Sequence, residues 1–118
     1  MDANIIANLC QDIAIPKMVK VKQHFDPSYI APEDIPQVIW KELDRDIIAA
    51  QIKSGMSIAI TCGSRGVANI DIIIKAVVDY VKQKGGSPFV FPAMGSHGGA
   101  TPEGQLEIVN GYGVTEEA

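Results

Sequence analysis

The chain has 118 residues, of which 47% are hydrophobic and 20% charged, and its formal net charge is −4. These values are ordinary for one soluble globular domain spanning residues 1–118. The negative charge argues against general nucleic-acid binding, because contacts with phosphates need a basic surface. No apolar run approaches the roughly 20 residues that a membrane-spanning helix requires, which argues against a membrane protein.

The sequence also indicates the compartment. Its beginning lacks a basic stretch followed by an apolar core, so no secretory signal is predicted. Cys10 and Cys62 are the only cysteines and form no C-x-x-C pattern, which is typical of two reduced thiols. We therefore expect a cytoplasmic protein.

The first third of the chain carries two patterns. Residues 16–23 alternate apolar and basic side chains with a period of two, which predicts a half-exposed strand whose lysines suit a sheet edge. After a turn-like stretch, residues 37–44 are predicted to be helical, with Trp40 in the core. The apolar residues 47–52 continue that helix or form a second one.

The middle of the chain predicts a β-α-β unit. Residues 56–61 form a short apolar strand that ends in the loop Cys62-Gly63-Ser64-Arg65-Gly66. Residues 68 and 69 open a periodic helix that stops at Lys84-Gly85-Gly86, and residues 87–91 form the next strand. A right-handed crossover would make the strands parallel and place the loops that follow them at one edge of the sheet. The apolar face of the helix comprises Ile70, Ile73, Ile74, Val77, Val78 and Val81.

The second loop, residues 92–101, is the most informative segment. His97 lies among glycines at the point where a strand hands over to a helix, and in open α/β sheets ligands bind at this edge. Thr101, Pro102 and Glu103 are typical of a helix start, whose free amides can hold an anion. Histidine exchanges a proton near neutral pH, and the guanidinium of Arg65 suits a carboxylate or phosphate. His97 and Arg65 are therefore the candidate catalytic residues.

The remaining candidates would bind a cofactor or phosphate through backbone amides and hydroxyl groups: Ser64, Gly66, Gly95, Ser96, Gly98 and Gly99. With two well-separated histidines and no cysteine cluster, no complete metal site is expected within these residues. The fold class predicted is α/β: a three-layer, Rossmann-like domain with a small, mostly parallel sheet. Because residues 114–117 begin an element that is not completed, we expect a fragment of a longer chain or a subunit that forms a homo-oligomer.

Both loops resemble the N-terminal domain of the lactate racemase family, in a branch predicted to use the nickel-pincer nucleotide. The resemblance covers residues 56–118 and rests on Gly63-Ser64-Arg65-Gly66, on the histidine loop running into Thr101-Pro102-Glu103-Gly104-Gln105, and on Gly111-Tyr112-Gly113. It implies an isomerase of 2-hydroxy acids, in which the cofactor accepts a hydride while a histidine removes the hydroxyl proton. By position, His97 corresponds to the first of two acid/base histidines and Arg65 to the arginine of the first loop.

The same resemblance sets limits. The second histidine, the cofactor-anchoring lysine and the nickel-binding histidine lie later in the family chain, so the fragment is predicted to be inactive alone. The family's first loop usually reads Asp-His-Thr-Arg-Pro, and Cys62 stands here in place of the acid, so the resemblance does not imply lactate itself as the substrate. The alternative is a small phosphate- or nucleotide-binding α/β module without catalysis of its own.

Overall fold

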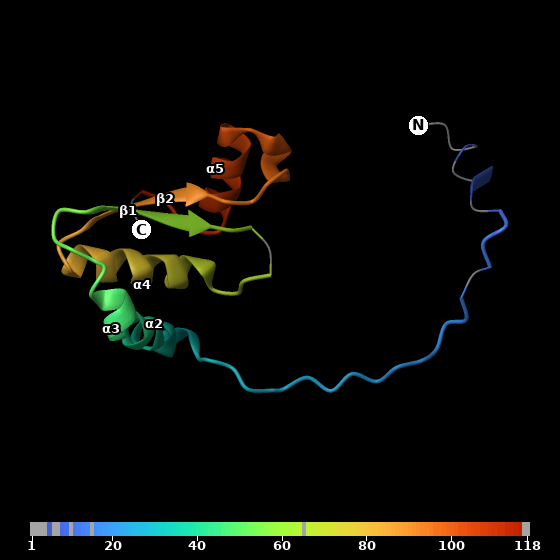
Figure 1. Ribbon diagram of the computed structural model, residues 1–118, viewed down its shortest axis with the longest axis horizontal. Coiled ribbons are helices and arrows are strands. Elements are labelled where there is room, and N and C mark those ends of the chain that lie inside the picture. The colour runs from blue at the N-terminus through green and yellow to red at the C-terminus, as the bar shows by residue number, and fades with distance from the viewer. Residues whose placement is uncertain (1–4, 6–7, 10, 15, 65, 117–118) are drawn as a thin grey trace.

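The computed structural model describes residues 5, 8–9, 11–14, 16–64 and 66–116. Figure 1 shows that the helices and strands from residue 32 onward are gathered in one body. In chain order, the elements are η1 (Pro32–Asp34), α2 (Ile35–Leu43), α3 (Asp46–Ala49), β1 (Ser57–Cys62), α4 (Ile70–Gln83), β2 (Ser87–Pro92), η2 (His97–Ala100) and α5 (Pro102–Gly111).

Strands β1 and β2 are parallel neighbours. Their register runs from Ser57 opposite Ser87 to Cys62 opposite Pro92, so both strands end at the same level. Just beyond that level, the amide of Ala93 donates to the carbonyl oxygen of Cys62 at 2.8 Å. The predicted β-α-β unit is confirmed, and the loops 63–69 and 93–101 leave the sheet at one edge.

The core lies on one face of the sheet. Ile60 and Cys62 of β1 are buried against Ile74 of α4 and Val109 of α5. The opposite face carries Ala59, Thr61, Phe89 and Phe91, all of which are exposed, Phe89 to 51% and Phe91 to 40%. No described element covers this opposite face, so the helix layer that a three-layer Rossmann-like arrangement would place there is not present among the described residues. Alternation along a strand assigns side chains to two faces, but only the partner elements decide which faces are covered.

Helix α4 packs against α2 as well as against the sheet. Tyr80 is fully buried, and its ring meets that of Trp40 edge to face with 6.0 Å between centroids. The Trp40 indole donates to the carbonyl of Ala76 at 2.9 Å, and the Tyr80 hydroxyl donates to the Asp44 carboxylate at 2.8 Å. The Trp40 indole N–H and the Tyr80 hydroxyl, which this contact removes from water, therefore each have a hydrogen-bond partner. The 37–44 helix prediction is confirmed, with α2 beginning two residues earlier, and residues 46–49 form a separate short helix.

Residues 16–31 contain no helix or strand. In Figure 1 this segment runs away from the body in an extended path. Its apolar side chains are exposed, Met18 to 92% and Val21 to 80%. The predicted strand at residues 16–23 is therefore wrong: alternation suits a strand, but a strand forms only where a neighbour accepts and donates its backbone hydrogen bonds.

Candidate functional site

The structure brings one residue from each loop into contact. Ser64 follows β1 and His97 opens η2, and the Ser64 hydroxyl is hydrogen-bonded to the Nδ1 atom of the His97 ring. Both side chains are half-buried. The two residues are 33 positions apart in sequence, so this contact depends on the parallel pairing of β1 with β2. The predicted convergence of the two loops is confirmed at these two side chains.

The histidine loop is built from an unusual run of backbone. Gly98, Gly99 and Ala100 all have left-handed dihedrals, with φ values of 60°, 67° and 57°. A Cβ on Gly98 would lie 2.3 Å from the carbonyl carbon of Gly104, so the loop rests directly on the first turn of α5. An alanine in this conformation is strained, and such strain often accompanies functional loops.

Thr101 closes the loop as predicted. Its hydroxyl accepts from the amide of Gly104 at 3.1 Å and donates to the carbonyl of Gly98 at 3.1 Å. Pro102 then occupies the start of α5 and Glu103 its first turn. The helix start that the sequence indicates is confirmed, including its cap.

Two residues that the sequence named only within the resembling motifs, and not as site residues, hold the loops in place. The Tyr112 hydroxyl donates to the backbone carbonyl of Ser64 at 2.5 Å. The side-chain amide of Gln105 donates to the backbone carbonyl of Gly95 at 2.6 Å. Both contacts reach back from α5 or the residue after it. Tyr112 stands between two glycines, which indicates a helix stop and gives no sign of a distant partner.

The other predicted site residues lie at the same edge without converging on one point. Gly66, Gly95, Ser96 and Gly99 are exposed, Gly98 is half-buried, and the Ser96 side chain makes no capping bond to η2. Arg65 falls outside the described residues. The described arrangement is thus an imidazole hydrogen-bonded to a hydroxyl group, in a loop that also contains Gly95, Gly98 and Gly99.

Cys62 lies at the end of β1, next to this edge, but points into the core. Its side chain is fully buried, and burial raises the pKa of its thiol. A buried thiol with a raised pKa is a poor nucleophile, because the thiolate is the reactive form. Cys62 is therefore a core residue in this fold.

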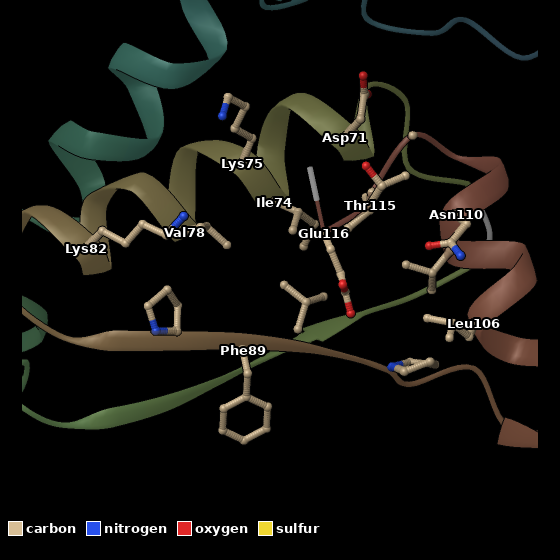
Figure 2. A pocket seen from close by; sticks show the side chains of 16 residues that line it. Asp71, Ile74, Lys75, Val78, Lys82, Phe89, Leu106, Asn110, Thr115 and Glu116 are labelled. Carbon is tan, nitrogen blue, oxygen red and sulfur yellow. The ribbon is translucent and has the colours of Figure 1, made fainter. Parts of the chain in front are cut away.

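A separate hollow lies away from these two loops. A cavity of about 360 Å³ opens between α4, β2, α5 and residues 113–116. Figure 2 shows Phe89 pointing away from α4 and Glu116 extending into the space between α4 and the strands. Asp71 and Thr115 lie above Glu116, whereas the Lys75 side chain projects away from this space. Neither Ser64 nor His97 lines this cavity, so it is separate from the predicted site.

A comparison with models of protein families, with curated proteins and with solved structures yields no significant match. Within the described ranges, no cluster of three or more His, Cys, Asp or Glu side chains is placed to hold a metal ion. Nor does any helix among the described residues combine the length and apolarity needed to cross a bilayer.

Proposed function

We propose that the chain is the N-terminal domain of a nickel-pincer-dependent racemase or epimerase of a 2-hydroxy acid. The observation that carries this proposal is the contact between Ser64 and His97 across the two loops at the end of the parallel strands. A proton-transfer group has to be held in a fixed place at an accessible edge, and both conditions are met by a half-buried imidazole with one nitrogen hydrogen-bonded.

In this proposal His97 is the acid/base group. Its imidazole accepts the proton of the substrate hydroxyl when the O–H bond breaks, and it returns that proton when the hydroxyl is formed again. Arg65 orients the substrate carboxylate, and the glycine backbone of residues 95–99 lets the ligand approach closely. The full Rossmann-like, three-layer domain would be completed by elements beyond those described.

The nickel-pincer nucleotide itself is not assigned to residues of this chain. No group of three potential metal ligands occurs among the described residues, so these residues do not by themselves fit a nickel site. Only the proton transfer and the orientation of substrate are therefore attributed to the chain. The isolated 118-residue chain should accordingly show no racemisation.

One observation favours the alternative, a phosphate- or nucleotide-binding module. The left-handed run 98–100 leads into the capped start of α5, an arrangement in which backbone amides can hold an anion. Under this alternative the purified chain should bind inorganic phosphate or AMP unaided. Titration of the isotope-labelled chain with each, followed by NMR, separates the two functions.

The proposed function is tested by racemisation of a panel of 2-hydroxy acids, measured by chiral chromatography on the protein that contains this domain, produced with its cofactor. We expect His97→Ala to lower the rate about 10²–10⁴-fold, the usual contribution of an acid/base group. His24→Ala is the matched control, because His24 is the chain's only other histidine and lies in the exposed segment 16–31. A His97→Ala variant with the wild-type rate would show that the assignment is wrong.

A further inference from the structure

We propose that the arm formed by residues 16–31 packs on the uncovered face of the sheet in a second copy of this chain, so that two copies exchange arms and form a dimer. Five apolar side chains of the arm are at least 76% exposed: Met18, Val19, Val21, Phe25 and Tyr29. The uncovered face carries the exposed side chains of both strands: Ser57, Ala59, Thr61, Ser87, Phe89 and Phe91. Exposed apolar surface that is gathered rather than scattered is typical of interaction sites, and the inference does not depend on the proposed function.

The uncovered face suits an apolar partner. Phe89 and Phe91 alternate with half-buried residues along β2, so their rings share one side of the sheet, with 6.3 Å between centroids. Ala59 is paired with Phe89 and Thr61 with Phe91, so the rings are flanked by small side chains on β1. None of the six exposed residues of this face is charged, so covering it would leave no charge buried without a partner.

The arm has a pattern that complements this face. Side chains alternate between the two sides of an extended chain, so Val19, Val21 and Phe25 share one side. Lys20 and Lys22 lie on the other side and can stay in water. At about 3.3 Å per residue, the distance from residue 19 to residue 25 is roughly 20 Å, which is also the length of a strand of six residues such as β1 or β2. The apolar side of the arm can therefore lie along the whole uncovered face.

The path of the chain favours a second copy over the arm's own body. The arm is joined through η1 to α2, and Figure 1 shows α4 between α2 and the sheet, so the arm leaves from the side of the body remote from the uncovered face. Ala31, which precedes Pro32, has extended backbone with φ −62° and ψ 140°, and the arm runs away from the body. To reach its own uncovered face, the arm would have to reverse within residues 24–31 and pass α4 and the sheet, roughly 20 Å of packed layers. The face of a second copy receives the arm without that reversal.

Charge and area agree with this partner. Residues 16–23 contain three lysines and no acidic side chain, whereas the whole chain has a formal net charge of −4. The remainder of the chain is therefore acidic and attracts the arm of another copy. A buried aromatic side chain contributes roughly 150–250 Å², and the exchange would engage two aromatic side chains on each arm and two on each face. Together with the valines, these side chains provide area on the scale of the roughly 1,200–2,000 Å² that a stable interface buries.

Two measurements on the 118-residue chain test the proposal, both under reducing conditions. Sedimentation equilibrium over concentrations from micromolar to millimolar should show association of monomers into dimers. An isotope-filtered NOE experiment on an equal mixture of ¹³C-labelled and unlabelled chains identifies the surfaces in contact. We expect NOEs between the methyl groups of Val19 and Val21 in one copy and the rings of Phe89 and Phe91 in the other.

Four variants, in two matched pairs, locate the interface. Val21→Asn should raise the dissociation constant of the dimer about tenfold or more, because a symmetric exchange loses the apolar contact twice. Met18→Asn is its control, since Met18 is 92% exposed but lies on the side of the arm that carries the lysines. Phe89→Ser should weaken the dimer at least as much as Val21→Asn does. Its control is Ile47→Ser, since Ile47 is 71% exposed but belongs to α3 and not to the uncovered face. Both controls should leave the dissociation constant unchanged.

Several outcomes would overturn the proposal. A chain that stays monomeric at millimolar concentration is one, and a dimer without NOEs between arm and rings is another. NOEs confined to a single copy would assign the uncovered face to the chain's own arm, and equal effects of Val21→Asn and Met18→Asn would remove the apolar side of the arm from the interface. If circular dichroism shows that Phe89→Ser does not fold, the pair of arm variants still decides, because both residues lie outside the folded body. None of these readouts uses racemisation, so failure here leaves the proposed function as it stands.

Discussion

The two loops at the end of the sheet are held in different ways. In the loop 63–69, a Cβ added to Gly63 or Gly66 would meet no described atom within 4 Å. In the loop 93–101, Gly98 lies against the backbone of Gly104, and Thr101 hydrogen-bonds to both of these residues. The second loop, which carries His97, is therefore packed against α5 at Gly98, although an added Cβ on Gly95 or Gly99 would meet nothing within 4 Å. The first loop lies in more open surroundings and reaches the second loop through Ser64.

The largest effect is expected where the second loop is most tightly packed. Gly98→Ala would place a Cβ 2.3 Å from a backbone atom of Gly104, in a conformation that already disfavours side chains. Backbone atoms cannot move aside as a flexible side chain can, so we expect a loss of about 3 kcal/mol or more in the free energy of unfolding. The loss is measured by urea unfolding of both proteins, monitored by circular dichroism.

Gly99→Ala is the matched control for that variant. Gly99 has nearly the same left-handed φ, 67° against 60°, but an added Cβ would meet nothing within 4 Å. Only the conformational strain remains, so the loss should be about 1–2 kcal/mol. Equal losses for the two variants would mean that the second loop is no more packed than the first.

Loss of the hydrogen bond that joins Tyr112, the residue after α5, to the first loop should lower stability by an intermediate amount. Tyr112→Phe removes the hydroxyl that donates to the carbonyl of Ser64 and keeps the ring. We expect a loss of about 1 kcal/mol in stability, together with faster amide exchange in residues 63–66 than in residues 94–99. Similar acceleration in both loops would contradict the view that Tyr112 holds mainly the first.

The strain in the second loop can be relieved. Ala100 has a φ of 57°, a region that glycine enters without steric cost. Ala100→Gly should therefore raise the free energy of unfolding by about 0.5–1 kcal/mol, since the relief of strain exceeds the added freedom of the unfolded chain. Thermal unfolding is the measurement, and a lower midpoint would show that Ala100 is not strained.

The smallest effect, seen only in acid, is expected at the contact between α2 and α4, which serves as a reference away from both loops. Hydrogen bonds from Tyr80 and then from Lys84 lower the pKa of Asp44. A lowered pKa stabilises the fold above the ordinary carboxyl value near 3.8, and this contribution is lost as the pH falls through the lowered value.

Asp44→Asn should therefore flatten the pH dependence of stability below about pH 4. Stability curves from pH 2 to 7 test this expectation. A variant whose stability falls in acid as steeply as that of the wild type would contradict it.

Local sequence alone determined the elements of the body. The periodic apolar residues of α4, the apolar runs of β1 and β2, and the Thr101-Pro102-Glu103 start of α5 each encode an element through contacts within a few residues. The order of strand, helix and strand then led to parallel pairing and to two loops at one edge. That much of the candidate site could be predicted from the sequence.

Only the tertiary structure decided the rest, because it depends on partners distant in the sequence. The alternating residues 16–23 resemble a strand as closely as β2 does, yet they find no neighbouring strand and stay extended and exposed. Helices α4 and α5 pack against the same face of the sheet, and this leaves Phe89 and Phe91 on the uncovered face. The bonds from Ser64 to His97 and from Tyr112 to Ser64 join residues 33 and 48 positions apart, a separation at which sequence periodicity carries no information about side-chain contact.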